Sequence, residues 1–346
     1  MIPSPDDLAR AYALTRQTTV RTPLLAAPAL AAASGAADVW VKAENLQKAG
    51  SFKIRGAIWR LAQLTPAERA RGVVAFSSGN FAQGLAAAGR EAGVPVTIVM
   101  PHDAPATKVR ATRDFGARLI LSDHGARPRE EVAAERARSV AADEGLVLLH
   151  PFDDPAIVAG QAGVALEALE QLDAIGAAAD VFACPTGGGG LIGGLSLAVR
   201  QACPAADVFA VEPQGFDSMG MALTRGAPAR LVATDRTICD ALQATMAGAA
   251  PFAAARAAGA RGVSVTDDSV RRAMRLAHDS LGLILEPSGA AAIAALLSGQ
   301  LPVAHRRVLL IASGGNISPE SFCALSGVAP DALRQTHQIT TDGDAR

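Results

Sequence analysis

A single lysine stands where a helix is expected to begin, in the stretch AGSFKIRGA from Ala49 to Ala57. That end of a helix carries a partial positive charge, so Lys53 sits against the helix dipole. The chain has 32 basic residues, of which only four are lysines: Lys42, Lys48, Lys53 and Lys108. An arginine stays protonated, whereas a desolvated lysine can lose its proton and attack a carbonyl carbon. Lys53 is therefore a candidate nucleophile or base, and a solvated lysine at a helix start is the alternative.

Four consecutive glycines, Gly187 to Gly190, lie between an expected strand and an expected helix. Backbone N–H groups that converge at a helix N-terminus bind phosphate, so the sequence predicts a phosphate site here. The stretch also fits a dinucleotide-binding pattern, with Gly188, Gly190 and Gly193 followed by Glu212 near the expected ribose position. That alternative fits the context poorly, because the pattern usually opens its domain and at least five expected strands precede it here.

Three further polar turns flank expected elements. Residues 77–80 (SSGN) follow a strand, and their hydroxyl and N–H groups could bind a carboxylate or simply cap the next helix. Residues 313–316 (SGGN) also follow a strand, and Glu286 precedes a Pro and a Gly at a helix start. In parallel α/β sheets, ligands bind beyond the carboxyl ends of strands. Together with Lys53, these turns predict a single cleft.

Short Val/Ile-rich runs alternate with Ala-rich helical stretches almost throughout the chain. Strands are expected at 38–44, 72–76, 95–100, 117–122, 146–150, 180–184, 207–212, 262–265 and 306–312. Helices are expected near 54–64, 80–92, 105–115, 129–144, 155–176, 190–202, 267–281 and 288–298. Strands separated by helices of 10 to 20 residues predict an α/β fold with parallel sheets, and so many strands favour two sheets. The last ten residues are expected to be disordered.

Composition argues against several classes of partner. The net charge is −1 with acidic and basic residues well mixed, so neither nucleic acid nor an anionic membrane is an expected partner. The apolar runs are far shorter than a membrane span, and the N-terminus is unlike a signal peptide. Cysteines at 184, 203, 239 and 323 lack any paired spacing, which is typical of reduced thiols in a cytoplasmic protein.

The motifs SFKIRGA, SSGNFAQG, GGGGLIGG and SGGN together resemble the signatures of the pyridoxal-phosphate (PLP) enzymes that include threonine dehydratases and serine racemases. The resemblance runs in order from about residue 20 to residue 325. It implies the tryptophan synthase β-like fold (fold type II), with two doubly wound parallel-sheet domains. By analogy, the large PLP-binding domain comprises 1–65 and 151–325, and a small mobile domain comprises 66–150. Residues 326–346 would be a tail without a regulatory domain, and a homodimer or homotetramer is expected.

The resemblance also implies roles for individual residues. The implied cofactor-binding set is Phe52, Lys53, Asn80, Gly187, Gly188, Gly189, Gly190, Leu191, Glu286 and Ser313. Within it, Lys53 would form the Schiff base, the glycines would hold the phosphate, and Ser313 would face the pyridine nitrogen. Phe52 would pack beside the ring and Asn80 would bond its hydroxyl. The substrate would contact Ser78, Gly79, Asn80 and Phe81, with its carboxylate on the 78–80 turn.

The activity implied is a PLP-dependent ammonia-lyase. An L-β-hydroxy amino acid such as threonine or serine would lose its Cα proton to Lys53 and then its β-hydroxyl, giving a 2-oxo acid and ammonia. An amino-acid racemase that uses Lys53 and Ser78 as its two bases is the alternative. Rival classes are a dinucleotide-dependent oxidoreductase and a non-catalytic binding protein built on the same fold.

Two positions depart from the family pattern. Many relatives have His after the Asn of SSGN, whereas this chain has Phe81, which could admit a bulkier substrate such as 3-phenylserine or could simply alter packing. Relatives that bind a structural cation place acidic ligands after a VEP stretch. Here only Glu212 and Asp217 match, so we predict no metal and keep these two residues as weak candidates for a cation site.

Overall fold

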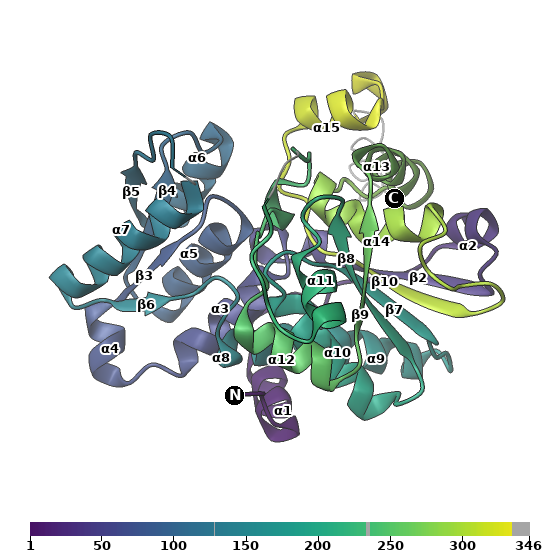
Figure 1. The fold of residues 1–346 in the computed structure, drawn as a ribbon, viewed down its shortest axis with the longest axis horizontal. Coiled ribbons are helices and arrows are strands. Elements are labelled where there is room, and N and C mark those ends of the chain that lie inside the picture. Colours follow the sequence, from purple (N-terminus) through teal and green to yellow (C-terminus); the bar gives the residue numbers. More distant parts are fainter. Residues whose placement is uncertain (128, 233–235, 334–346) are drawn as a thin grey trace, which may run out of the picture.

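The computed structural model describes residues 1–127, 129–232 and 236–333. Its strands form two sheets that lie in separate halves of the molecule (Figure 1). The six-stranded sheet has the order β1-β2-β10-β7-β8-β9 and is parallel except for β1. The four-stranded sheet has the order β5-β4-β3-β6 and is entirely parallel. The predicted α/β class and the prediction of two parallel sheets are confirmed.

The strand bounds agree closely with the expected ones. The six-stranded sheet consists of β1 (Leu24–Ala26), β2 (Asp38–Ala43), β7 (Val181–Pro185), β8 (Asp207–Pro213), β9 (Arg261–Val265) and β10 (Arg307–Ala312). The four-stranded sheet consists of β3 (Val73–Phe76), β4 (Val96–Pro101), β5 (Arg118–Ser122) and β6 (Val147–Leu149). Only the three-residue β1 was not expected. The four-stranded sheet falls inside the predicted small domain of 66–150, whose boundaries stay a prediction.

Helices cover both sheets, and α3 and α8 lie where the two halves meet (Figure 1). They are α1 (Pro5–Thr15), α2 (Pro28–Ser34), α3 (Lys53–Ala62), α4 (Pro66–Arg71), α5 (Asn80–Ala92), α6 (Ala106–Asp114), α7 (Arg129–Glu144), α8 (Pro155–Gln161), α9 (Gly163–Ala174), α10 (Gly190–Ala202), α11 (Ser218–Arg225), α12 (Ala249–Ala257), α13 (Asp267–Leu281), α14 (Pro287–Leu297) and α15 (Pro319–Ser326). The 3-10 turns are η1 (Glu44–Leu46), η2 (Lys48–Gly50) and η3 (Asp240–Leu242).

The expected helix at 155–176 is in fact two helices, α8 and α9, that meet at Ala162. Gly160 and Gly163 flank this junction, and glycine lowers helix propensity. These small residues also permit close packing. A Cβ added to Gly160 would lie 2.7 Å from the Cα of Gly56 in α3. The expected disorder of the last ten residues lies outside the described part of the chain.

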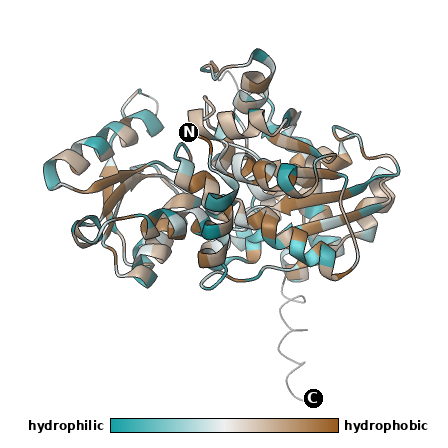
Figure 2. Ribbon diagram, turned by 90° about the horizontal axis from the view of Figure 1, so that it is seen from below, coloured by the Kyte–Doolittle hydropathy of each residue, from teal (hydrophilic) through white to brown (hydrophobic). Residues whose placement is uncertain are grey.

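Apolar side chains fill both faces of the sheets. In Figure 2 the strands of both sheets are mostly brown, which marks hydrophobic residues, and teal residues lie on the outer helices. Strand β10 is representative, because every residue from Val308 to Ala312 is buried. This continuous burial is typical of parallel strands covered by helices on both faces. No helix within the described ranges is both long enough and apolar enough to cross a membrane.

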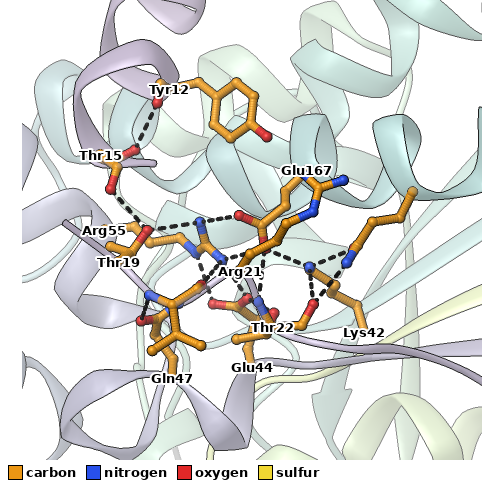
Figure 3. Close-up of polar contacts among 12 residues, drawn as sticks. Tyr12, Thr15, Thr19, Arg21, Thr22, Lys42, Glu44, Gln47, Arg55 and Glu167 are labelled. Atoms are coloured by element: carbon orange, nitrogen blue, oxygen red, sulfur yellow. Dashed lines mark hydrogen bonds and ion pairs between the residues drawn. The ribbon is translucent and has the colours of Figure 1, made fainter. Parts of the chain in front are cut away.

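Four charged side chains form a buried ion cluster beneath the start of α3, drawn in Figure 3: Lys42, Glu44, Arg55 and Glu167. Arg55 donates to Glu44 through Nε (2.9 Å) and Nη2 (2.7 Å), and to Glu167 through Nη2 (2.9 Å). The Nζ of Lys42 donates to Glu167 (2.6 Å). Two cations thus face two carboxylates. The cluster joins β2, η1, α3 and α9 two residues beyond Lys53, so it fixes the first turn of α3.

Candidate active site

A cleft of about 1070 Å³, counted to its open mouth, lies at the carboxyl ends of strands from both sheets. Ser77, Pro151, Thr186 and Ser313 follow β3, β6, β7 and β10 and line it. All the cofactor and substrate residues predicted from the sequence also line this cleft: Phe52, Lys53, Ser78, Gly79, Asn80, Phe81, Gly187, Gly188, Gly189, Gly190, Leu191, Glu286 and Ser313. The structure therefore brings together residues from positions 52 to 313.

Lys53 is the first residue of α3, and the segment before it is fixed to the turn after β10. Ser51 forms a β-bridge with Gly314, and the N–H of Phe52 donates to the carbonyl of Ser313 (3.3 Å). The Nζ of Lys53 lies 5.2 Å from the centroid of the Phe52 ring. These contacts direct the lysine amine into the cleft between the two halves of the molecule.

The surroundings of Lys53 make its amine easier to deprotonate than that of an exposed lysine. Burial in the cleft lowers the pKa of Lys53 to about 8, because a charged ammonium loses solvation there. The negative charges of Glu130 and Glu286 act in the opposite direction and limit this decrease in pKa. A lysine with such a pKa exists partly as the free amine near neutral pH, and the free amine is the form that can attack a carbonyl carbon.

The glycine loop, Gly187 to Gly190, precedes and begins α10. Gly189 has φ of 100°, a left-handed conformation that favours glycine. A Cβ on Gly188 would lie only 2.3 Å from ring atoms of Phe152. The loop therefore needs glycine at position 189 for its backbone conformation and at position 188 to avoid overlap with Phe152. The first N–H groups of α10 have no intrahelical partners, and the first two residues of this helix line the cleft, as a phosphate site requires.

The three polar turns meet in one hydrogen-bond network. The Nδ2 of Asn80 donates to Glu286 Oε1. Asn316 donates from Nδ2 to Asn80 Oδ1 (2.7 Å) and to the carbonyl of Ala49 (2.9 Å). Asn80 is thereby held at both ends of its amide. At the 78–80 turn, the N–H of Gly79 donates to Ser77 Oγ (3.2 Å).

Glu286 carries an unusual carboxyl group. Burial raises the pKa of Glu286 to about 7, and the nearby negative charge of Asp240 adds to this increase, whereas Lys108 opposes it. Its Oε2 is buried and has no hydrogen-bond partner among the described residues. A carboxyl group with this pKa is partly protonated near neutral pH, so Oε2 can offer either a donor or an acceptor to a molecule in the cleft.

Phe76, Phe81 and Phe152 line the cleft, and we refer to these three rings as its aromatic wall. Phe81 lines the cleft but is only 2% exposed and packs in the core of the four-stranded sheet. The ring of His150 contacts Phe76 and Phe152 edge to face, at centroid distances of 5.3 and 4.6 Å. Burial lowers the pKa of His150, which favours its neutral form, and its ring supports this wall from behind Phe76 and Phe152.

Several lining residues were not predicted from the sequence: Phe76, Lys108, Glu130, Phe152 and Asp240. The scarcity of lysine, which drew attention to Lys53, applied equally to Lys108 and could have identified it. Asp240 and Glu130 gave no such signal, because acidic residues are frequent in this chain.

The two weak metal candidates lie elsewhere, in a second cavity beside α11. Both oxygens of Glu212 accept backbone hydrogen bonds, from the N–H groups of Met219 (2.7 Å) and Gly220 (2.8 Å). Asp217 lines the same cavity. The described residues include no group of three or more His, Cys, Asp or Glu side chains arranged to hold a metal ion. Glu212 thus accepts hydrogen bonds from the first turn of α11, and the cation site stays a prediction.

The residues of the main cleft fit pyridoxal phosphate. The cofactor needs an amine for its aldehyde, N–H donors for its phosphate, and polar groups at the ring hydroxyl and ring nitrogen. Lys53 provides the amine and the glycine loop provides the N–H donors. Asn80 and Ser313 provide polar groups on the same cleft.

Comparisons with known proteins agree with this fit. The family model for pyridoxal-phosphate dependent enzymes matches residues 15–314. An L-threonine ammonia-lyase of Thermotoga maritima is 36% identical over 90% of this chain and 75% of its own length. An L-threo-3-hydroxyaspartate ammonia-lyase of Saccharomyces cerevisiae is 33% identical over 94% and 97%. The solved structure of maize serine racemase superposes with a TM-score of 0.84, at 32% identity over 92% and 96%. The chain belongs to the family of pyridoxal-phosphate-dependent enzymes.

Proposed function

We propose that this protein is a PLP-dependent ammonia-lyase that converts an L-β-hydroxy amino acid into a 2-oxo acid and ammonia. The observation that carries the proposal is the amine of Lys53, with its pKa lowered to about 8, in a cleft shared with the glycine loop and the 78–80 turn. Relatives named as ammonia-lyases act on threonine and 3-hydroxyaspartate, both of which carry a β-hydroxyl group.

In this proposal the cofactor is held by the predicted set. Lys53 would bind its aldehyde, Gly187 to Gly190 and Leu191 would bind its phosphate, and Phe52 would pack beside its ring. Asn80, positioned by Glu286, would bind the ring hydroxyl, and Ser313 would bind the ring nitrogen. When bound, pyridoxal phosphate withdraws electrons from the substrate Cα and so makes its proton acidic.

The chain's own groups then orient the substrate and move its proton. The N–H groups at the start of α5 bind the α-carboxylate, because they have no partners in the helix. The free amine of Lys53 accepts the Cα proton at Nζ. Ser313 would present a hydroxyl rather than a carboxylate to the ring nitrogen of the cofactor, and this choice of residue would favour loss of the β-hydroxyl.

The range of substrates follows from the aromatic wall. Phe76, Phe81 and Phe152 give the cleft an apolar side, which supports acceptance of a bulky β-substituent such as that of 3-phenylserine. The burial of Phe81 in the core of the four-stranded sheet supports a packing role as well. We propose that L-threonine, L-serine and L-threo-3-phenylserine are all candidate substrates and that the aromatic wall sets their order.

The first experiment measures 2-oxo acid release from these three amino acids by the holoenzyme. We expect the wild-type enzyme to release a 2-oxo acid from at least one of these substrates. In Lys53→Ala we expect both this release and the yellow colour of the bound cofactor to be lost. Lys48→Ala is the matched control, because Lys48 forms an exposed ion pair with Glu91 outside the cleft. Absence of release from every substrate by the wild-type holoenzyme would overturn the proposal.

Racemisation is the second candidate function. Ser78 lines the cleft with Lys53, and maize serine racemase is a structural neighbour. Exchange of the Cα proton of L-serine in D2O, with formation of D-serine, would support this activity. Loss of D-serine in Ser78→Ala with elimination retained would assign Ser78 as the second base.

We further propose a homodimer or homotetramer in the cytoplasm, with the small domain (66–150) moving relative to the large one (1–65 and 151–325). All four cysteines are free thiols, which supports a reducing compartment. Sedimentation of the holoenzyme tests the oligomeric state directly.

A further inference from the structure

Lys108, near the start of α6, is a second lysine of the cleft. Its side chain is only 10% exposed and forms an ion pair with Asp240 of η3. Its ammonium also lies beside the 78–80 turn, because a Cβ placed on Gly79 would be 3.9 Å from Lys108 Nζ. Lys108 therefore occupies the space between the turn that the proposal above assigns to the substrate carboxylate and the opposite wall of the cleft.

The wall of the cleft opposite the 78–80 turn contains η3, and η3 is held against α14 and the glycine loop. The N–H of Ala241, next to Asp240, donates to Ser288 Oγ of α14 (3.0 Å). The carbonyl of Ala241 would be 3.0 Å from a Cβ on Gly187, so η3 lies against the glycine loop. The pair between Lys108 and Asp240 thus spans the cleft, from the four-stranded half to the glycine loop.

The charges of the cleft explain why a cation is needed there. Its charged lining residues in the described chain are Lys53, Lys108, Glu130, Asp240 and Glu286. If Lys53 is bound to the cofactor, Lys108 is the cation left among three acidic groups. An amino acid brings a carboxylate into this acidic surrounding, and repulsion from the carboxylate of Asp240 opposes its entry.

We infer that Lys108 is a substrate-binding residue whose ammonium attracts the α-carboxylate of the amino acid at the 78–80 turn. This inference rests on the proposed function, because that function places the carboxylate at the turn. Lys108 then shares its charge between Asp240 and the substrate, and it screens the substrate from Asp240. A purely structural pair, which only links the two halves of the molecule, is the competing interpretation.

The test compares a carboxylate with its neutral isostere. L-Alanine and L-alaninamide lack a β-leaving group, so their binding to the holoenzyme is measured from the change in cofactor absorbance. In Lys108→Met we expect L-alanine to bind about 10- to 100-fold more weakly, the usual effect of losing a charge-assisted hydrogen bond, and L-alaninamide to change less than about threefold. Lys108→Arg should retain most of the affinity for L-alanine, because it keeps the charge.

Two controls separate the interpretations. Asp240→Asn should leave L-alanine binding unchanged or tighter, because Lys108 loses a competing partner. Lys48→Met should change neither ligand. Equal weakening of both ligands in Lys108→Met, or the same loss in Asp240→Asn, would overturn the inference and leave a structural link. This titration measures ligand binding and does not depend on elimination. The absence of 2-oxo acid release would therefore contradict only the proposed function.

Discussion

At the scale of single residues, lysine is scarce and each of the four lysines has distinct surroundings. Lys42 lies in the buried ion cluster, and Lys48 forms an exposed pair with Glu91. Lys53 and Lys108 both line the cleft. Where a flexible point charge or a removable proton is needed, arginine is no substitute, because its guanidinium is planar and stays charged.

The pKa of Lys53 predicts how the apoenzyme takes up its cofactor. Only the neutral amine attacks the cofactor aldehyde, so below its pKa the rate of loading should rise about tenfold per pH unit. We expect this rise to level off near pH 8, where the pKa of Lys53 lies. Stopped-flow measurement of colour formation against pH checks this. A rate that continues to rise to about pH 10 would indicate an ordinary lysine.

Phe81 allows a prediction about substrate choice. In Phe81→His a polar ring replaces an apolar one that is 2% exposed, so we expect a stability loss of about 1 to 3 kcal/mol. The ratio of kcat/KM for L-threo-3-phenylserine to that for L-threonine should also fall, because a phenyl group would meet a polar wall. Steady-state kinetics with both substrates measure the ratio. An unchanged ratio would assign Phe81 to packing alone.

At the scale of elements, the glycine loop depends on its contact with Phe152. In Gly188→Ala the new methyl group would overlap the Phe152 ring, so the loop must shift and its N–H groups would no longer converge. We expect cofactor affinity to fall at least about tenfold, as for the loss of one charge-assisted hydrogen bond. Equilibrium dialysis measures this. Adding Phe152→Leu should restore part of the affinity, whereas wild-type affinity in the single variant would contradict the steric argument.

The buried ion cluster predicts a large effect on stability. Arg55→Met leaves the carboxylates of Glu44 and Glu167 with Lys42 alone, and breaking a buried pair on one side typically costs about 3 to 5 kcal/mol. Arg10→Met is the control, because Arg10 forms an exposed pair with Asp7 and should cost less than about 1 kcal/mol. Thermal unfolding of both holoenzyme variants tests this. Equal decreases in the unfolding temperatures of the two variants would contradict a larger contribution of the buried ion cluster to stability.

The bounds of the strands could be predicted from the sequence more completely than the set of residues that line the cleft. The strands were found because continuous Val/Ile runs such as 307–312 have few other structural solutions. Motif residues such as Gly188 and Asn80 were predicted to share one cleft because glycines and polar turns at strand ends are unusual, and both line the cleft, whereas their roles stay a prediction. Asp240 and Glu130 were missed, because their approach to Lys108 and Lys53 depends on the packing of elements far apart in sequence. The meeting of Asn80, Glu286 and Asn316 is likewise a product of tertiary structure.

At the scale of the whole molecule, the cleft joins two halves that each have their own sheet (Figure 1). A molecule bound there contacts residues from both halves, such as Ser78 and Gly188. Binding to the folded state alone stabilises a protein, by about 2.7 kcal/mol when the ligand is at a hundred times its dissociation constant.

Removal of the cofactor should therefore lower the unfolding temperature by several degrees. We expect the wild-type apoenzyme to regain its stability when pyridoxal phosphate is added. Lys53→Ala should regain less, because it cannot bond to the aldehyde. Differential scanning calorimetry of both proteins, with and without cofactor, gives the comparison. Equal stabilisation of the variant would show that phosphate contacts account for the effect.

The position of β10 has a consequence for how the protein forms. This strand, the last one described along the chain, lies in the interior of the six-stranded sheet, between β2 and β7. Until residues 307–312 have been synthesised, β2 and β7 have no partner between them and expose unpaired backbone groups. The four-stranded sheet, in contrast, is complete by Leu149. On the ribosome, the four-stranded half of the molecule can fold early, while the other half and the lysine pocket must wait until β10 has been synthesised.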